Sequence, residues 1–384
     1  MPDKIRVLFA IGSMGGGGSE RQLLGILRYL DRSTFSPLLY LIYRNGEFIE
    51  DIPKDVPVFA FWERHSKPGL NYPGRIFRMQ CRDLAEVIQE QEANLLYART
   101  FSMALIAHGG VRNTGVPWVG VEAADPKLGL EENTDRFVRF KHWMLGRAYR
   151  SASRVLTVSE GVRRSMLDYY DLPPEQVTTI YNFMDLDRID RLAAEGTPRL
   201  DDDRFHIVCA GRLHPQKGYR YLLEAIEELV HRRGLKRLLL HLIGQGPQES
   251  ELKKLTAESG LERHVVFEGF LQNPYTFYKA CQLFCLPSLY EGMPNTLLEA
   301  MACRIPVLAA DCPSGPREIL RDDEHGLLVP PADSKALADA IWNATENYED
   351  WQARVEPARQ YIEDEFSPKV GIKRLQDLLL EVRG

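Results

Sequence analysis

The sequence predicts an α/β fold made of two successive domains in which parallel strands alternate with helices. The chain has 384 residues, enough for two domains that each bury a core. An apolar run at residues 5–11 is followed by a glycine-rich stretch and then by apolar residues at helical spacing. The same order of strand, loop and helix starts afresh at residue 205, after a polar and irregular stretch.

The composition is that of an ordinary soluble globular protein, with 44% hydrophobic and 27% charged residues. A net charge of −6 argues against a dedicated nucleic-acid-binding protein. The six cysteines show no disulfide framework and no zinc-site spacing, so buried, reduced thiols are expected. The apolar start is too short for a signal peptide, and no stretch is long enough to span a membrane. A cytoplasmic protein is therefore expected.

Residues 5–11 predict a buried strand, and the helix that follows is expected to start at Ser19, a natural N-cap. The loop between them, residues 12–18, contains five glycines. Glycine lets the backbone approach a phosphate closely, so this loop is predicted to contact one. Its spacing fits neither the dinucleotide-binding G-x-G-x-x-G pattern nor a P-loop.

The rest of the first half alternates apolar runs with helical patterns. A helix is expected at residues 76–89. Strands are expected at residues 37–43, 56–61, 93–97, 117–121, 155–158 and 177–181. His108 is interpreted as a structural imidazole near a helix end.

Two segments of the first half mix basic and aromatic residues. The first is residues 61–73, and the second, residues 136–154, holds six Lys/Arg and no acidic residue. Such segments can lie on an anionic membrane surface or receive a phosphorylated acceptor. They are equally compatible with a helix that has a solvated basic face and a buried aromatic one.

The second half opens with a strand at residues 205–209, a loop and a helix at 219–230. Arg212 and Lys217 lie on that loop, at the carboxyl end of the strand. Two cations in this position can neutralise a diphosphate and the charge that develops on a nucleotide leaving group. Further strands are expected at 238–243 and 265–269.

The most informative stretch follows a short strand at residues 283–287. Glycine and proline then break the backbone, which places Glu291 on a tight loop. Asn295 or Thr296 is expected to cap a buried helix that contains Glu299 about one turn from its start. The N–H groups and partial positive charge of that helix end favour a diphosphate, and a nearby carboxylate can bind a ribose diol.

Glu291 and Glu299, with seven residues between them in this apolar context, resemble the E-x7-E motif of family-4 retaining glycosyltransferases. Weaker similarities to that family are Gly-Gly-x-Glu-Arg at residues 17–21, Gly-x-Gly-Pro at 244–247 and the string at 326–331. The resemblance implies the GT-B fold, in which two Rossmann-like domains face a central cleft with ligands at the strand ends.

The resemblance also implies roles for individual residues. Glu291, Arg212 and Lys217 would be catalytic: the glutamate faces the donor sugar and the two cations stabilise the leaving diphosphate. Glu299 would bind the ribose. The donor-binding set would be Gly16, Gly17, Gly211, Gly244, Gly246, Phe270, Leu271, Gly292, Met293, Pro294, Asn295, Thr296, Leu297 and Glu299. Many members have a His after the strand at 117–121; here Glu122 stands in that region, and it is placed on the acceptor side with Gly15 and Arg99.

The domains implied are an acceptor-side domain at residues 1–188, a linker at 189–204 and a nucleotide-sugar domain at 205–366. The final helix, residues 367–384, is expected to pack back on the first domain. The expected reaction moves a hexose or N-acetylhexosamine, with retention, from a nucleotide-diphosphate sugar, a UDP-sugar first among them. The acceptor would be a hydroxyl of a glycan or lipid-linked sugar in cell-surface polysaccharide or glycoconjugate synthesis.

No cofactor and no obligatory metal are expected, because the cations and the helix end can neutralise the phosphates. The expected partners are the donor, the acceptor and an anionic membrane at its cytoplasmic face, with no nucleic acid. Three alternatives stay open: an epimerase of the same architecture, a non-catalytic partner in a glycan-assembly complex, and an NAD-dependent oxidoreductase. Donor turnover without acceptor would favour the first, and absence of any turnover the second. The missing dinucleotide fingerprint counts against the third.

Overall fold

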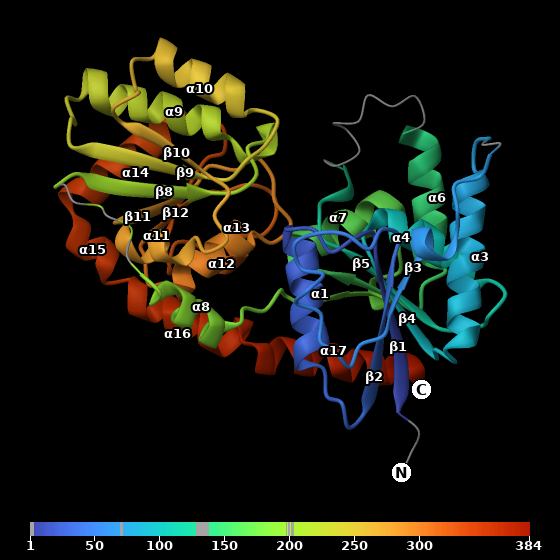
Figure 1. Cartoon of the computed structure of the whole chain (residues 1–384). Coiled ribbons are helices and arrows are strands. Elements are labelled where there is room, and N and C mark those ends of the chain that lie inside the picture. Colours follow the sequence, from blue (N-terminus) through green and yellow to red (C-terminus); the bar gives the residue numbers. More distant parts are fainter. Residues whose placement is uncertain (1–3, 70–71, 128–137, 197, 199, 201–202) are drawn as a thin grey trace. The chain divides into compact units, whose positions relative to one another are not determined.

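The computed structural model describes residues 4–69, 72–127, 138–196, 198, 200 and 203–384. The chain forms two compact units (Figure 1). Unit 1 comprises Met1–Phe183 together with Pro368–Gly384, and unit 2 comprises Met184–Ser367.

Unit 1 is built on a seven-stranded parallel sheet with the strand order β3-β2-β1-β4-β5-β6-β7. Its strands are nearly continuous apolar runs because helices cover both faces of the sheet. In chain order its elements are β1 (Ile5–Ile11), α1 (Gly18–Tyr29), β2 (Phe35–Leu41), β3 (Val58–Ala60), α2 (Phe61–Arg64), α3 (Arg75–Glu90), β4 (Leu95–Arg99), α4 (Phe101–Val111), β5 (Trp118–Glu122), α6 (Val138–Arg150), β6 (Arg154–Thr157), α7 (Glu160–Tyr170), η1 (Pro174–Gln176), β7 (Val177–Thr179) and α17 (Pro368–Arg383).

Two local expectations in unit 1 were wrong. The helix after the glycine loop begins at Gly18, and the cap position belongs to Gly17, not Ser19. Gly17 has no side chain, so no side-chain cap satisfies the first turn of α1. The strand expected at 56–61 ends at Ala60, because Phe61 begins the short helix α2 and is buried there.

The C-terminal helix α17 belongs to unit 1, where it packs against α1. Ile372 and Leu375 share one apolar core with Leu23 and Leu27. The last residue of the first segment, Phe183, is fixed to the same helices. The buried Gln22 side chain donates to the carbonyl oxygen of Phe183 (2.8 Å) and accepts from its N–H (3.2 Å).

Unit 2 has a six-stranded parallel sheet with the order β10-β9-β8-β11-β12-β13. Its core lies between this sheet and helices that include α9 and α14. In chain order its elements are α8 (Leu186–Ala193), β8 (Phe205–Ala210), η2 (Pro215–Lys217), α9 (Tyr219–Glu227), η3 (Glu228–Arg232), β9 (Leu238–Ile243), α10 (Glu249–Glu258), β10 (Val265–Gly269), α11 (Tyr275–Ala280), β11 (Leu283–Leu286), α12 (Asn295–Ala302), β12 (Val307–Ala310), α13 (Pro316–Leu320), β13 (Leu327–Val329), α14 (Ser334–Glu346), α15 (Tyr348–Gln352) and α16 (Val355–Phe366).

Part of the segment expected as a linker, residues 189–204, is helical in the structure. Helix α8 covers its start, because Asp185 accepts a hydrogen bond from the N–H of Arg188 (3.1 Å) as an N-cap. The helix packs against α11 and α12, and Asp190 pairs with the buried Arg359 of α16 at 2.8 Å. The acidic run at 201–203 lies almost wholly outside the described residues.

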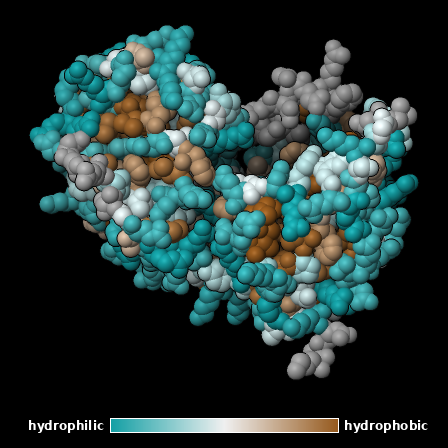
Figure 2. Space-filling model, viewed as in Figure 1, coloured by the Kyte–Doolittle hydropathy of each residue, from teal (hydrophilic) through white to brown (hydrophobic). Residues whose placement is uncertain are grey.

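Figure 2 shows one face of the molecule, on which hydrophilic residues cover most of the surface and hydrophobic residues form patches within each unit. Of the helices that the structure describes, none combines the length and the apolar character needed to cross a bilayer.

Candidate functional site

The predicted donor residues of unit 2 gather where the strand order of its sheet reverses. That reversal lies between β8 and β11, which are neighbours in the sheet. Gly211 and Arg212 follow β8, Gly244 follows β9, Phe270 follows β10 and Glu291 follows β11. Because all strands are parallel, these loops meet at the carboxyl edge of one sheet. This is the position in which open α/β sheets bind ligands.

The central contact joins two of the three residues that the sequence analysis expected to be catalytic. The Nζ atom of Lys217 lies 2.5 Å from Oε1 of Glu291, and the Ser288 hydroxyl donates to the same oxygen at 2.7 Å. The Glu291 side chain is only 7% exposed, and that of Lys217 is 18% exposed. The structure therefore holds a carboxylate and an ammonium group in a fixed, partly dehydrated pair.

The loop that carries Lys217 is attached directly to the loop that carries Glu291. The N–H of Leu289 donates to the carbonyl oxygen of Gln216 (2.8 Å), and the Gln216 amide donates to that of Tyr290 (2.9 Å). Gly218 has a φ of +64°, and a Cβ there would lie 2.0 Å from the carbonyl oxygen of Pro287. Only glycine allows this close approach of the two loops.

Helix α12 begins at Asn295, so Pro294, and neither Asn295 nor Thr296, occupies the cap position. No side chain of the cap accepts a hydrogen bond from the first turn. The Thr296 hydroxyl is buried and has no hydrogen-bond partner among the described residues. Glu299 lies in the second turn of α12 and is 2% exposed. The helix start thus presents donors of the kind that bind a phosphate.

The remaining predicted donor residues differ in what they expose. Arg212 is exposed and forms no hydrogen bond or ion pair with any residue that the structure describes. Phe270 is 47% exposed. Gly244 approaches Gly211 so closely that a Cβ would lie 2.0 Å from its carbonyl oxygen. The side chain of Leu297 is fully buried, so only its backbone could face a ligand.

The other residues of the donor set lie in loops next to strands and helices. Gly292, Met293 and Pro294 are buried in the turn before α12, Gly246 follows β9 and Leu271 follows β10. Gly16 and Gly17 lie in the exposed loop before α1 and belong to unit 1.

The three residues assigned to the acceptor side follow neighbouring strands of unit 1. Gly15 follows β1, Arg99 ends β4 and Glu122 ends β5, and these strands lie side by side in the sheet. The Glu122 carboxylate is already occupied: it accepts from the Tyr149 hydroxyl (2.7 Å) and from the N–H groups of Ala123 (3.0 Å) and Ala124. Burial raises the pKa of Glu122 above that of an exposed carboxyl, because it disfavours the charged form.

His108 lies in the last turn of α4, and its Nδ1 is 2.7 Å from the Ser151 hydroxyl. This contact agrees with the structural role expected for His108. The structure also confirms free thiols: all six cysteines are unpaired, five of them buried. Burial raises the pKa of Cys209, to about 12, which keeps this thiol protonated and unreactive.

One group of three side chains within the described ranges has the spacing of a metal site: His65, Asp83 and Glu86. Asp83 is buried, and its carboxylate already accepts from Arg64 (2.8 Å), Tyr40 (2.8 Å) and His65 (2.8 Å). This cluster therefore tethers α2 to α3. The buried Asp83 carboxylate thereby fixes the start of the basic and aromatic segment 61–73.

Sequence reasoning did not find the residues that connect the catalytic loops. Neither Ser288 nor Gln216 belongs to a motif. The Tyr219 hydroxyl, which donates to the carbonyl oxygen of Gly211 (2.9 Å), was missed as well. Only Ser288 had an indication, its position two residues after the end of β11.

Comparison with known proteins gives the family. Residues 204–347 match the model of the glycosyl transferases group 1 family, and residues 16–188 match that of glycosyltransferase family 4. An N-acetylgalactosamine-N,N'-diacetylbacillosaminyl-diphospho-undecaprenol 4-alpha-N-acetylgalactosaminyltransferase of Campylobacter jejuni is 29% identical over 83% of this chain and 84% of its own length. An alpha-D-kanosaminyltransferase of Streptomyces kanamyceticus is 31% identical over 56% of each chain.

The same fold occurs in the crystal structure of the Anabaena protein HepE in complex with UDP. The TM-score is 0.82 at 22% identity, covering 98% of this chain and 100% of that one. The two parallel sheets, the family matches and this structural likeness confirm the fold and the family that the sequence resembled. The chain belongs to the family-4 glycosyltransferases of the GT-B fold.

Proposed function

We propose that the protein transfers a hexose or N-acetylhexosamine from a UDP-sugar to a hydroxyl of a glycan or lipid-linked acceptor, with retention of anomeric configuration. The observation that carries this proposal is the Lys217–Glu291 pair beside the start of α12, at the switch point of the unit 2 sheet. It supplies positive charge for a diphosphate and a carboxylate next to the sugar.

Each residue of the site has a proposed part in the reaction. Breaking the bond between the anomeric carbon and the donor phosphate leaves negative charge on the departing diphosphate. Lys217, the exposed Arg212 and the first-turn N–H groups of α12 stabilise that charge. Glu299 accepts hydrogen bonds from the ribose. Glu291 faces the sugar, and because Lys217 and Ser288 hold its Oε1, it serves as a fixed charge better than as a covalent nucleophile.

The relatives support the choice of substrates. The name of the Campylobacter protein states that it transfers N-acetylgalactosamine to a sugar on diphospho-undecaprenol, which supports an N-acetylhexosamine and a lipid-linked acceptor. HepE was crystallised with UDP, which supports a UDP-sugar donor. The expected process is polysaccharide or glycoconjugate synthesis.

The donor and acceptor are tested by incubating the protein with UDP-glucose, UDP-N-acetylglucosamine, UDP-galactose, UDP-N-acetylgalactosamine and GDP-mannose, each with and without lipid-linked sugars. We expect UDP release that depends on the acceptor, and an α-linked product by NMR from an α-linked donor. A new nucleotide sugar formed without acceptor would favour the epimerase instead. No turnover with any pair would favour a non-catalytic partner.

The reaction is proposed to need no metal ion, because cationic side chains and a helix start already provide charge for the phosphates. Turnover measured after EDTA treatment should equal turnover in untreated enzyme. Loss of activity that added Mg²⁺ restores would contradict this part of the proposal.

A membrane contact is proposed on one rim of unit 1. Helix α4 contacts both α3 and α6, and all three begin at the carboxyl edge of the sheet, since α4 follows β4 directly while α3 and α6 end just before β4 and β6 (Figure 1). Four aromatic side chains in the first turns of these helices are 39% to 59% exposed: Phe77, Phe101, Phe140 and Trp143.

The charge of this rim suits an anionic bilayer. Helix α6 carries Arg139, Lys141, Arg147 and Arg150 and no acidic residue. Aromatic rings at the headgroup level and Lys/Arg near acidic lipids are the usual features of interfacial binding. A protein seated there would meet a lipid-linked acceptor at the same edge of the sheet that holds Gly15, Arg99 and Glu122.

Liposome flotation tests the rim. The wild type should float with phosphatidylglycerol vesicles at low salt and much less at high salt, because the Debye length shortens. Phe140→Ala combined with Trp143→Ala should reduce flotation. Tyr29→Ala removes an exposed aromatic at the end of α1, at the opposite edge of the sheet, and should change nothing. Equal flotation of all three proteins, or none, would leave only a solvated basic helix.

A further inference from the structure

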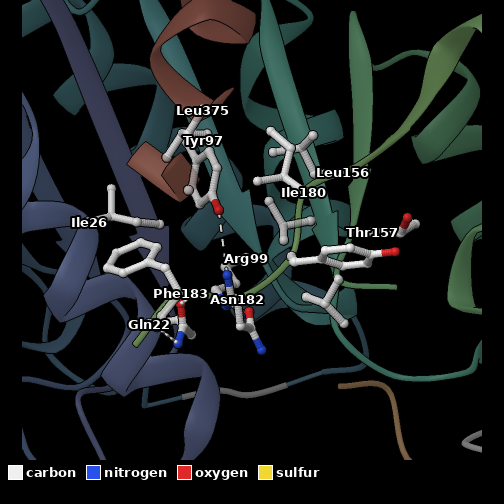
Figure 3. A pocket seen from close by; sticks show the side chains of 14 residues that line it. Gln22, Ile26, Tyr97, Arg99, Leu156, Thr157, Ile180, Asn182, Phe183 and Leu375 are labelled. Atoms are coloured by element: carbon white, nitrogen blue, oxygen red, sulfur yellow. Dashed lines mark hydrogen bonds between the residues drawn. The ribbon is translucent and has the colours of Figure 1, made fainter. Parts of the chain in front are cut away.

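Unit 1 contains a small cavity at the carboxyl ends of β4, β5, β6 and β7, covered by α1 and α17 (Figure 3). It is partly open and has a volume of about 30 Å³, room for one or two water molecules or a group of that size. Aliphatic side chains make up much of its wall. The polar residues that line it are Gln22, Tyr97, Arg99, Thr157, Tyr181 and Asn182.

The feature that sets this cavity apart is the guanidinium group of Arg99. The residue is 3% exposed, yet its Nε atom has no hydrogen-bond partner among the described residues. Its Nη1 atom reaches only the Tyr97 hydroxyl, at 3.5 Å, which is the limit for a hydrogen bond. No carboxylate of the described chain lies within 4.0 Å of it. Figure 3 shows the group beside Tyr97 and Asn182.

The surrounding side chains do not compensate this charge. Both ends of the Gln22 amide are bonded to the backbone of Phe183. The Thr157 hydroxyl pairs with that of Thr179 at 3.2 Å. Glu122 senses the charge of Arg99, but its oxygens are taken by Tyr149 and by backbone N–H groups. A buried cation without a partner costs stability, so its presence here needs another reason.

We infer that this cavity binds an oxyanion carried by the acceptor, a carboxylate or a phosphate, with Arg99 as its ligand. The inference rests on the proposed function insofar as the acceptor is taken to bind unit 1. The planar fork of a guanidinium presents two parallel N–H donors that match two oxygens of such a group. The Tyr97 hydroxyl, which accepts from Arg99 Nη1, can donate its own hydrogen to a remaining oxygen. The small volume favours a group of carboxylate size.

The test compares Arg99→Met with a matched control, Arg112→Met, which removes an exposed arginine just after α4. The probes are sodium glucuronate and inorganic phosphate, with glucose and sodium chloride at equal ionic strength as references. Thermal unfolding is followed for each protein. Glucuronate or phosphate should raise the Tm of the wild type and of Arg112→Met, and should not change that of Arg99→Met.

Unfolding without probes separates a binding role from a structural one. An uncompensated buried charge lowers stability, so Arg99→Met should melt at the same temperature as the wild type or higher. Two results together would overturn the inference: a lower Tm for Arg99→Met than for the wild type, and a wild-type Tm that neither glucuronate nor phosphate changes. They would mean that Arg99 is structural. If Arg99→Met does not fold, Arg99→Lys supplies the same comparison, because it keeps the charge and loses the fork.

The two probes separate the sources of the oxyanion. A shift with glucuronate alone assigns the cavity to an acidic sugar, and a shift with phosphate alone assigns it to a phosphorylated acceptor. Equal shifts in Arg99→Met and the wild type would sink either version. UDP titration of Arg99→Met should match that of the wild type, since the proposed donor residues that hold the diphosphate belong to unit 2. Lost oxyanion binding with intact UDP binding would therefore concern this cavity only.

Discussion

At the residue scale, the proposed chemistry depends on the carboxylate of Glu291. Glu291→Ala removes a charge whose proposed part is in the transition state, and it leaves Lys217 without its partner. We expect kcat to fall by about 10²–10³-fold, while donor affinity changes less. Steady-state kinetics together with calorimetric titration of UDP checks both numbers. A variant with the turnover of the wild type would show that Glu291 has been misassigned.

Glu299 is expected to act on binding instead. Glu299→Ala removes the proposed hydrogen bonds to the ribose, worth about 1–3 kcal/mol, so the Kd for UDP should rise about 5- to 150-fold. Glu258→Ala, at the exposed end of α10, is the control and should leave the Kd unchanged. An equal Kd for Glu299→Ala and the control would contradict the assignment.

Glu122 gives a prediction about pH. Burial raises the pKa of this carboxyl in the folded protein above its ordinary value of 4.5. Its stabilising contribution is therefore full at low pH and is lost as the pH rises through the folded pKa. Glu122→Gln stays neutral, so it should gain stability relative to the wild type as the pH rises above about 4.5. Urea unfolding over a pH series measures this; a constant difference would argue against a buried, neutral carboxyl.

The sequence could predict the environment of a residue where it depends on neighbours in the chain, and could not where it depends on distant residues. Glycine and proline around Glu291 were enough to place it on a tight loop, and the structure has it there. Its pairing with Lys217 spans 74 residues and follows only from the packing of two loops. The burial of Arg99 was equally invisible, since the cavity around it is lined by residues from α1, the segment after β7 and α17.

At the scale of elements, the close contact between two loops holds the site together. Gly218→Ala combines strain at a positive φ with a clash against the carbonyl oxygen of Pro287, 2.0 Å from the new Cβ. Gly234→Ala has a similar φ of +75° but open space around it. Gly234→Ala should lower the free energy of unfolding by about 1–2 kcal/mol. Gly218→Ala should lower it by more.

Urea unfolding measures the stability of Gly218→Ala and Gly234→Ala, and a turnover assay measures their activity. Gly218→Ala should also lose activity, because it pushes Lys217 away from Glu291, whereas Gly234→Ala should keep it. Equal losses of stability and activity in both would mean that the contact between the loops has no special role.

Element ends were harder to predict than elements, for physical reasons. The polar composition near residue 189 suggested a linker, but the Asp185 cap and the buried Ile189 stabilise α8 there. Helices α1 and α12 begin at residues without a side-chain cap, Gly17 and Pro294. A preference for polar caps therefore placed both starts too late.

At the scale of the whole molecule, apolar runs separated by helices were enough to predict two parallel sheets. The order of strands was not, because periodicity does not say which strands are neighbours. The reversal between β8 and β11 is what assembles the loops of the donor site. The inclusion of α17 in unit 1 rests on apolar contacts with α1, and only the family resemblance suggested it beforehand.

Calorimetric titration of UDP into three proteins shows whether Arg212 and Lys217 hold the diphosphate: the wild type, Arg212→Ala combined with Lys217→Ala, and Arg220→Ala. Arg220 is an exposed arginine of α9 that pairs with Glu224 and serves as the control. Two charge-assisted hydrogen bonds are worth about 1.5–3 kcal/mol each, so the double variant should bind at least about 100-fold more weakly. The control should bind UDP as the wild type does. If the double variant binds UDP as tightly as the wild type, the diphosphate does not lie where this account places it.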